Sequence, residues 1–567
     1  MRYLACSMAI LAGLVQLGGL ASAKETLPGL LDRAVMKEER ARARQQKRDA
    51  QAAVIGHAKA LGYSKDQIQQ ALTPAMLRRG HFRVTAKDGT VVEFPWYRIG
   101  FAENRLANWH KSVNTGLHET NKGGVRLHHA VFANEVYALA LKMDTKLATA
   151  GDSIGPHAFR GAKGGIGAGR VVKVGSRYAA NVGDYVDPAS PVFDRAAIMR
   201  AFGRSYRVKG GDVGPGLDIQ AGDVNTKAPE MKVLSETYGS KRTPSAGVSG
   251  KRVRRHRDGS INPIGGIEYR AISTGDGVWM ATRLAARRAG LKVRGATVVA
   301  QGWGEVGRAF GHAAADDGAR VIAIQELWNV GGQRVAGVLH HPLGASAKPR
   351  QVKQWLAEVE ALRASGQDLS RYQGGKLMRQ FKQGQDASGV RADIVGINAL
   401  GGVLNQTTVP AYVRSGTHQG RRKILAEGAN LAQTSAGARM LDRNQGRLLT
   451  ITGDLANLGG VHVSDLEAVQ NGYRLPVTSP QARRSLQSTI RSGWNRAMKI
   501  AKQQGISERK AIERSAVDGM MKRSLHTRGA PHSRMERRAF SASIAGKAQP
   551  PPARSRASLG WLPPLRR

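Results

Sequence analysis

The stretch Gly302-Trp303-Gly304-Glu305-Val306-Gly307 has glycine at its first, third and sixth positions. Residues 296–301 before it are apolar and strand-like, and residues 306–315 after it have the apolar spacing of a helix. In that setting the first glycine permits a tight turn, the second lets the backbone approach a pyrophosphate, and the third lets the helix pack on the strand. The stretch therefore predicts a dinucleotide site at a helix N-terminus, with Glu305 and Val306 beside the phosphates.

A second predicted strand, residues 320–324, ends near Glu326, which lies 24 residues after Gly302. An acidic residue at about this spacing binds the 2′-hydroxyl of the adenosine ribose in such sites. Its charge would repel a 2′-phosphate, so we expect NAD as the cofactor, with NADP as the alternative.

Outward from this motif, residues 275–466 alternate short β-branched runs with Ala-rich helical stretches, which is typical of a parallel sheet built from βαβ units. Residues 327–389 interrupt the alternation and read as an insertion. We therefore expect an α/β protein of two domains: an N-terminal substrate domain with a mixed sheet, and a Rossmann-like, doubly wound dinucleotide domain.

Three upstream lysines occupy unusual settings. Lys122 opens Lys-Gly-Gly-Val-Arg, Lys146 ends the helix-like residues 135–146, and Lys163 is flanked by glycines on both sides. A glycine-lined backbone allows a ligand to approach closely, and a desolvated lysine near other cations has a lowered pKa that suits acid and base catalysis.

These motifs, in this order, resemble the Glu/Leu/Phe/Val amino-acid dehydrogenase family over residues 118–475, and its glutamate dehydrogenases most. The resemblance includes His118-Glu119-Thr120-Asn121-Lys122-Gly123-Gly124-Val125-Arg126 and Ala221-Gly222-Asp223-Val224. It implies the following roles: catalysis for Lys163 and Asp223; substrate binding for Lys122, Lys146, Arg270 and Ser464; cofactor contacts for Thr274, Asn430 and Asn457.

The implied reaction is the reversible NAD(P)-dependent deamination of L-glutamate to 2-oxoglutarate and ammonia, in a homohexamer. A carboxylate such as Asp223 can shuttle protons while a low-pKa Lys163 stabilises the developing oxygen, and Lys146 and Lys122 can fix the substrate carboxylates. Two alternatives stay open: a dehydrogenase of Leu, Val or Phe, and a non-catalytic basic binding protein on the same scaffold. Departures from the family pattern at Pro156-His157, at residues 397–402 and at Asp276 favour the latter.

Length and composition divide the chain further. The chain has 567 residues, 41% of them hydrophobic, and is too long to fold around a single hydrophobic core. We expect a substrate and oligomerisation domain at 24–266, a dinucleotide domain at 267–466, and C-terminal helices at 467–524 that pack back on the first domain. Residues 1–23 have the pattern of a signal peptide ending in Ala21-Ser22-Ala23, and residues 525–567 that of a disordered basic tail. Residues 251–257 predict a basic surface loop between the domains.

Charge and cysteine content limit the partners. Lys and Arg number 87 against 42 acidic residues, a net charge of +45, which predicts non-specific nucleic-acid affinity at most, because no aromatic platform accompanies the basic runs. Cys6 is the only cysteine, so neither a disulfide nor a Cys-based zinc site is expected, and no metal site is predicted. We expect no stable membrane span in the mature chain. The signal peptide indicates a periplasmic or secreted protein, whereas the family resemblance indicates a cytoplasmic one.

Overall fold

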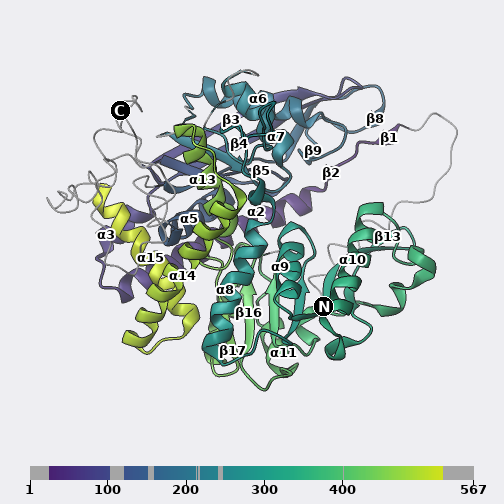
Figure 1. Ribbon diagram of the computed structural model, residues 1–567. Coiled ribbons are helices and arrows are strands. Elements are labelled where there is room, and N and C mark those ends of the chain that lie inside the picture. Colours follow the sequence, from purple (N-terminus) through teal and green to yellow (C-terminus); the bar gives the residue numbers. More distant parts are fainter. Residues whose placement is uncertain are drawn as a thin grey trace.

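The computed structural model describes residues 24–102, 120–150, 159–211, 213–214, 217–240, 245, 247–399 and 401–527. They form two α/β units, drawn in purple to blue and in teal to green in Figure 1. The expected signal peptide, His118-Glu119, Pro156-His157 and all but the first three residues of the expected tail lie outside the described residues.

The first unit is built on an eight-stranded mixed sheet. Seven strands follow the order β10-β5-β6-β4-β7-β9-β2, and β3 pairs antiparallel with β4. Strands β5 and β6 are parallel to each other, as are β10 and β5, so their C-terminal ends meet at one edge. The strands are β2 (Leu30–Leu31), β3 (Met76–Thr85), β4 (Val91–Gly100), β5 (Thr120–Leu127), β6 (Phe159–Ile166), β7 (Gly169–Lys173), β9 (Tyr185–Val186) and β10 (Asp218–Gly222). Two short strands, β1 (Glu25–Thr26) and β8 (Tyr178–Ala179), pair separately.

Helices cover both faces of this sheet. On one face α6 (Arg195–Val208) and α7 (Ala228–Tyr238) pack on the apolar side chains of β3, β4 and β5. On the other face α5 (Ala133–Ala150) lies against β6, flanked by α2 (Arg33–Ala60) and α3 (Lys65–Leu72). Helix α5 continues four residues beyond Lys146, so the expectation that Lys146 ends this helix was wrong. The residues after it, Leu147 to Ala150, are apolar or β-branched and buried, and they extend the packing face.

The second unit contains a seven-stranded sheet of order β14-β13-β12-β11-β15-β16-β17. Strands β12, β11, β15, β16 and β17 are parallel, which is the doubly wound arrangement expected from the sequence. The strands are β11 (Thr297–Gln301), β12 (Arg320–Val330), β13 (Gln333–His340), β14 (Phe381–Gln383), β15 (Ile394–Ile397), β16 (Lys423–Glu427) and β17 (Leu448–Ile451).

The segment expected to be an insertion, residues 327–389, adds antiparallel strands to the edge of this sheet. Strand β12 does not end near Glu326 but runs to Val330, and only its first part, up to Gln325, pairs with β11. The rest turns back through Gly331-Gly332, both with positive φ, into the antiparallel strand β13. Two glycines between apolar strands are the ordinary signal for a two-residue hairpin, and β14 then pairs with β13 at the sheet edge.

Helices again cover both faces of the second sheet. One face carries α8 (Ser273–Ala289), α9 (Glu305–Asp316) and α10 (Pro349–Ser365), and the other carries α11 (Thr408–Arg414) and α12 (Ser435–Arg443). Successive residues of β11 alternate between these two cores, Val298 and Ala300 facing α8 and Val299 facing α11.

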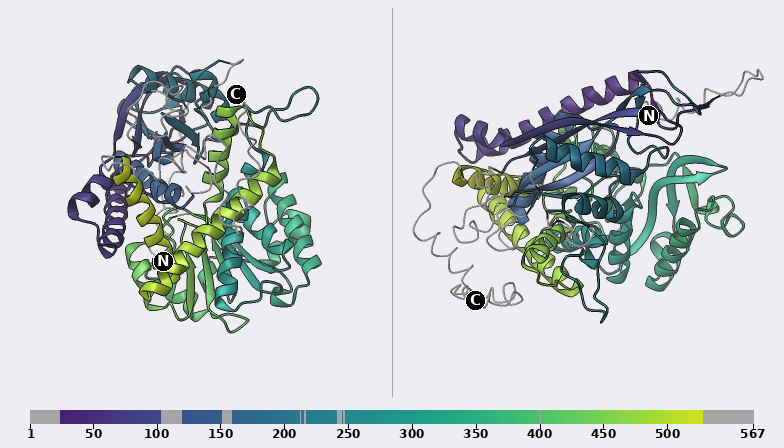
Figure 2. Two further views of the ribbon diagram at one scale, coloured as in Figure 1. Left: turned by 60° about the vertical axis from the view of Figure 1, so that its left-hand side comes forward. Right: turned by 90° about the horizontal axis from the view of Figure 1, so that it is seen from above.

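Three C-terminal helices connect the units: α13 (Gly459–Tyr473), α14 (Ser479–Gln504) and α15 (Glu508–Thr527). Figures 1 and 2 show α14 and α15, in yellow-green, running along one side of the molecule. Helix α15 packs on α2, α3 and α5 of the first unit, whereas α14 contacts mainly α8 of the second. The boundary expected at 466–467 falls inside α13, and α15 extends three residues past the expected start of the tail.

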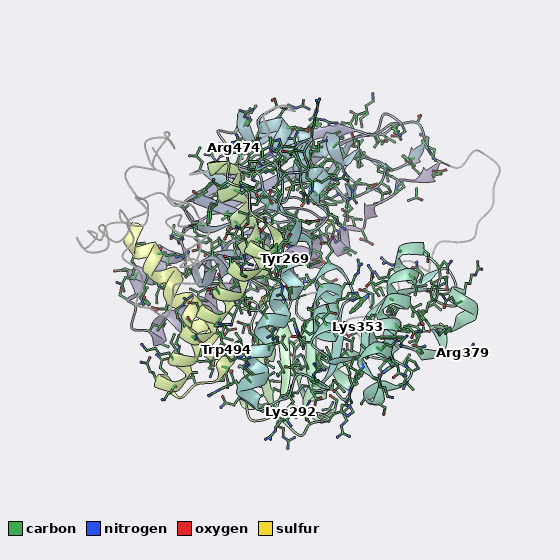
Figure 3. All side chains as sticks on the ribbon, in the orientation of Figure 1. Tyr269, Lys292, Lys353, Arg379, Arg474 and Trp494 are labelled. Atoms are coloured by element: carbon green, nitrogen blue, oxygen red, sulfur yellow. The ribbon has the colours of Figure 1, made fainter. Side chains whose placement is uncertain are left out.

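Charged side chains are spread over both units, as Figure 3 illustrates with Lys292, Lys353 and Arg379 on the second unit and Arg474 at the end of α13. The basic run at 251–257 is exposed at Arg252 and from Arg254 onward, but Lys251 is half-buried and its side chain forms an ion pair with Glu467. The run is the expected surface loop over most of its length, and Lys251 is the residue that turns inward. Within the described ranges, every helix is too short or too polar to cross a bilayer.

Candidate functional site

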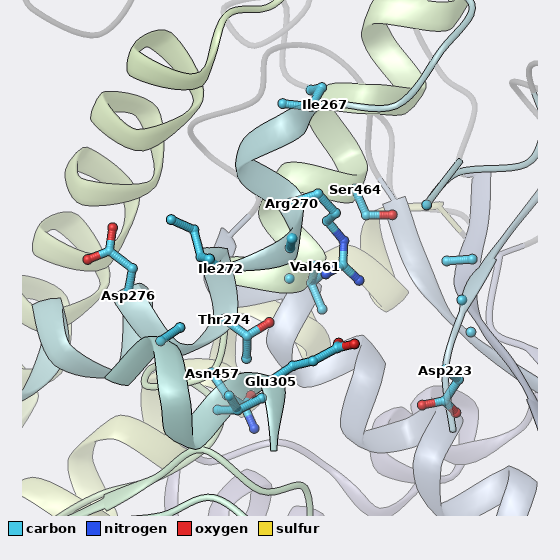
Figure 4. Close-up of a pocket in the computed structure, with 18 of the residues that line it drawn as sticks. Asp223, Ile267, Arg270, Ile272, Thr274, Asp276, Glu305, Asn457, Val461 and Ser464 are labelled. Carbon is cyan, nitrogen blue, oxygen red and sulfur yellow. The ribbon is translucent and has the colours of Figure 1, made fainter. Parts of the chain in front are cut away.

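A cavity of about 1350 Å³ opens between the two units. It is lined by side chains from β5, α5, β6, η1 (Glu268–Ala271), α8, α9 and α13, and Figure 4 shows Arg270, Thr274 and Glu305 approaching it from one unit and Asp223 from the other. Of the residues expected in the site, the cavity wall includes Lys122, Lys146, Lys163, Asp223, Arg270, Thr274, Glu305, Val306, Asn430, Asn457 and Ser464. Gly302, Gly304, Gly307 and Glu326 lie outside that wall, at the adjoining end of β11 and β12.

The glycine turn joins β11 to α9. Gly302 has φ +89°, a conformation that favours glycine. Its N–H donates a 2.8 Å hydrogen bond to Gln325 O, which ties the turn to β12. A Cβ on Gly307 would lie 1.9 Å from Gly302 O, so this glycine is required for the helix to pack on the turn. A Cβ on Gly304 would meet nothing within 4 Å. Gly304 is the N-cap of α9 and supplies no side-chain cap, which leaves open space where the helix begins.

Glu326 holds this turn from the neighbouring strand. Its carboxylate accepts a hydrogen bond from Trp303 N at 2.7 Å and another from Leu327 N at 2.9 Å. It lies one residue after the parallel pairing of β11 and β12 stops, at the C-terminal end of that pairing. Glu326 therefore sits beside the first peptide of the glycine turn.

Lys163 and Asp223 lie together in the cavity. Lys163 Nζ is 2.8 Å from Asp223 Oδ2, and Arg126 Nε is 2.9 Å from the same oxygen. Burial lowers the pKa of Lys163, an effect that the Asp223 carboxylate opposes and the Arg126 cation reinforces. Burial would raise the pKa of Asp223, but Arg126 and Lys163 hold it well below its ordinary value. The spacing permits direct proton transfer between Lys163 and Asp223.

Arg126 was not singled out from the sequence, although it belongs to the Lys122 motif. Residues 122, 124 and 126 of β5 alternate onto one face of the sheet, and β10 delivers Asp223 to the same face. Arg126 also forms an ion pair with the buried Glu135 at the start of α5. The strand period was the signal that could have found it.

Lys146 reaches the cavity from α5. Its ammonium donates a hydrogen bond to Asn430 Oδ1, and Asn457 Nδ2 donates to Gly428 O at 3.1 Å, so the loops after β16 and β17 meet at this point. Burial and the neighbouring Lys142 cation lower the pKa of Lys146 to about 7. Lys142, one turn earlier on α5, is itself paired with Asp454.

Lys122 lines the cavity from β5 and contacts α13. Its Nζ donates to Ser464 Oγ at 2.7 Å and is 3.0 Å from Asp465 Oδ1. Ser464 also shares a 2.6 Å hydrogen bond with Ser249. Burial lowers the pKa of Lys122, against the opposing effect of Asp465. Asp465 was not expected here from the sequence.

Arg270 also lines the cavity, from η1. Its guanidinium makes no ion pair or hydrogen bond with any described residue, and Figure 4 shows it extending toward the space between Ser464 and Glu305. Burial lowers the pKa of Arg270. Asp276, in contrast, points away from Arg270 and accepts a 2.8 Å hydrogen bond from Arg483 Nε.

The glycines around the lysines serve packing as well as access. A Cβ on Gly161 would lie 2.2 Å from Asp144 N and 2.4 Å from Ala140 O, so this glycine lets α5 approach β6. A Cβ on Gly124 would lie 2.7 Å from Asp223 Cβ. The close contact of sheet and helix buries Lys163 and Lys146 together.

Two family models match the chain: the Glu/Leu/Phe/Val dehydrogenase dimerisation domain over residues 108–240, and the Glutamate/Leucine/Phenylalanine/Valine dehydrogenase domain over residues 265–527. The chain belongs to the Glu/Leu/Phe/Val dehydrogenase family. The two matched regions correspond to the two units that flank the cavity.

Relatives within this family are named glutamate dehydrogenases. The chain is 26% identical to the glutamate dehydrogenase of Aeropyrum pernix over 449 residues, covering 77% of this chain and 88% of the relative. It is 27% identical to that of Thermotoga maritima over 445 residues, covering 76% and 88%. The crystal structure of glutamate dehydrogenase from Peptoniphilus asaccharolyticus has the same fold, with a TM-score of 0.61 at 24% identity over 86% of this chain and 99% of that one.

As a member of this dehydrogenase family, the chain is an amino-acid dehydrogenase. Its site uses amine, guanidinium and carboxylate groups. No group of three or more His, Cys, Asp or Glu side chains in the described part of the chain is placed to hold a metal ion.

Proposed function

We propose that this dehydrogenase catalyses the reversible, NAD-dependent oxidation of L-glutamate with water to 2-oxoglutarate and ammonium, with release of a proton. The single observation that carries the proposal is the 2.8 Å pair of Lys163 and Asp223, in a cavity that also contains Lys146 and Lys122. Two lysines that line one cavity suit a substrate with two carboxylates.

A nicotinamide dinucleotide fits the residues present. Gly304 leaves open space at the N-terminus of α9, where backbone N–H groups and the helix dipole favour a pyrophosphate. Glu326 is beside the same turn and suits a free 2′-hydroxyl better than a 2′-phosphate, which favours NAD over NADP. Asn457 Oδ1 lines the cavity and has no hydrogen-bond partner in the described chain, so it can accept from the carboxamide of the nicotinamide. A nicotinamide held there would supply the acceptor for the hydride of the substrate Cα.

The chain's own groups perform the remaining chemistry. Lys146 binds the α-carboxylate, and Lys122, Ser464 and Arg270 surround the side-chain end. Asp223 takes a proton from the substrate amine and releases it to solvent as the one proton of the net reaction. After hydride loss, the resulting iminium carbon faces Lys163 and the restored Asp223 carboxylate. Asp223 then removes a proton from the attacking water, and the Lys163 ammonium stabilises the carbinolamine oxygen that forms. Asp223 returns that proton to the carbinolamine nitrogen, and the C–N bond breaks as the ketone forms. The hydroxyl proton leaves with the ammonia as ammonium, so Lys163 and Asp223 return to their starting states, 2.8 Å apart.

Steady-state rates with purified protein test this proposal. L-glutamate, L-leucine, L-valine and L-phenylalanine are each supplied with NAD or NADP at pH 6 and at pH 8, and the reduced cofactor is measured. We expect the highest kcat/KM for glutamate with NAD. Turnover of leucine, valine or phenylalanine without turnover of glutamate at either pH would replace glutamate as the substrate, and a higher kcat/KM with NADP would overturn the cofactor choice.

The oligomeric state is a further part of the proposal. The glutamate dehydrogenase of Thermus thermophilus, which shares the fold with a TM-score of 0.62 at 20% identity, is described as hetero-hexameric. We expect this chain to assemble as a homohexamer, which light scattering of the purified protein measures directly; a monomer or dimer at working concentration would contradict it.

A further inference from the structure

The cation at the side-chain end of the cavity is already compensated. Lys122 Nζ is 3.0 Å from Asp465 Oδ1, and both side chains are almost completely buried, at 2% and 1% exposure. Asp465 follows Ser464 on α13 but does not line the described cavity, so it lies behind Lys122 as seen by a ligand. It therefore acts on a ligand through Lys122, as a positioning residue.

The surroundings of Asp465 do not satisfy its charge fully. Neither carboxylate oxygen makes a well-aligned hydrogen bond with a described residue, although the ion pair with Lys122 is close. The other charged groups that act on it are Arg270 on η1 and Arg523 on α15. On its own helix, the buried Glu467 is paired with Lys251. Burial raises the pKa of Asp465 to about 6, which the Lys122 cation opposes.

We propose that Asp465 is the specificity-determining counter-ion of the side-chain subsite: while ionised it neutralises Lys122, so a substrate with a side-chain carboxylate binds together with a proton, whereas an uncharged side chain binds without one. This inference deepens the proposed glutamate reaction and rests on its placement of the substrate side chain at Lys122. The two carboxylates would share the buried Lys122 ammonium, with Arg270 as the other cation of the subsite, and their mutual repulsion raises the higher of their two pKa values, so that group takes the proton.

The direction of the effect follows from linkage. A ligand that raises the pKa of Asp465 binds more tightly to its protonated form, so affinity rises as pH falls. Above pH 6, where free Asp465 is ionised, the dissociation constant of a dicarboxylate should increase about tenfold per pH unit until the pKa of the complex is reached. Proton uptake at pH 7 should approach about one per site.

Calorimetric binding of glutarate and of pentanoate to the full chain tests the inference without turnover. The two ligands have the same carbon chain, but only glutarate has a second carboxylate. Titrations at pH 7 in two buffers of different ionisation enthalpy count the protons taken up. Pentanoate reports proton uptake at Lys146, whose pKa is also near neutrality, and the excess for glutarate reports the side-chain subsite. We expect an excess of about one proton in the wild-type protein.

Two isosteric variants identify the group. Asp465→Asn should remove the excess proton uptake with glutarate and strengthen glutarate binding at pH 8. Glu467 is an equally buried carboxylate on the same helix, paired with Lys251, and Glu467→Gln should keep the excess proton uptake. Equal uptake for both ligands in the wild type would overturn the inference, since Arg270 alone would then compensate the second carboxylate. An excess retained in Asp465→Asn or lost in Glu467→Gln would also overturn it. Should Asp465→Asn not fold, the wild-type comparison decides, and failure to oxidise glutamate would bear on the proposed reaction alone.

Discussion

Replacing Lys163 by Met separates a catalytic lysine from a structural one. Methionine keeps the length of the apolar stem and removes the ammonium that lies 2.8 Å from Asp223 Oδ2. Losing a positioned acid or base lowers rate by about 10²–10⁴, so we expect kcat to fall at least about a hundredfold, or about 2.7 kcal/mol. Substrate affinity should fall much less, because Lys146 and Lys122 remain in the cavity wall to bind the carboxylates.

The fold should survive this substitution. Asp223 keeps Arg126 at 2.9 Å on the same oxygen, and the lost hydrogen bond to a charged group contributes about 1.5–3 kcal/mol, partly offset because an ammonium is no longer buried. Initial rates and thermal unfolding are measured beside Lys232→Met, a control on α7 whose side chain is 64% exposed. If the two variants had the same kcat in a folded, active protein, Lys163 would not be the catalytic group.

Three further predictions concern the rest of the cavity. Because burial lowers the pKa of Lys146 to about 7, its charge is lost as pH rises through that value, and kcat/KM for any amino acid should fall above pH 7. Lys146→Met should raise KM about tenfold or more and abolish this fall of kcat/KM above pH 7. Glu326→Ala should shift the ratio of kcat/KM for NAD over NADP toward NADP by about tenfold, and an unchanged ratio would remove Glu326 from cofactor selection. Gly307→Ala should lower the free energy of unfolding, measured with a chemical denaturant, by about 1–3 kcal/mol, since its Cβ would overlap Gly302 O. Gly304→Ala should unfold like the wild type, because its Cβ would meet no other atom, but should bind NAD more weakly in a fluorescence titration.

The dinucleotide motif was predictable because its determinants are local. A strand, a glycine turn and a helix were expected over residues 296–315, and β11 and α9 occupy Thr297–Gln301 and Glu305–Asp316 around Gly302, which has the positive φ that a tight turn requires. Segment 327–389 was expected to interrupt the alternation as an insertion, but its pairing with the sheet was not predicted, although Gly331-Gly332 between apolar runs specifies a hairpin.

The candidate site was predictable only in part because its contacts join distant segments. The family motif named Lys122 and Ser464, yet nothing local indicates that Asp465 reaches Lys122, since the helical face of α13 and the register of β5 together decide that contact. Lys251 shows the converse. In a basic run it reads as solvated, but Glu467 on α13 buries it in an ion pair.

Hydride transfer itself provides the most direct test. The purified protein is incubated with L-glutamate carrying deuterium at Cα and with NAD, and the reduced cofactor is examined by mass spectrometry. The account predicts one deuterium in each reduced cofactor formed, and its loss from the product 2-oxoglutarate, because the proposed complex would hold Cα and nicotinamide together beside Lys163 and Asp223. Reduced cofactor without deuterium, or no reduction with glutamate or any other amino acid, would contradict it.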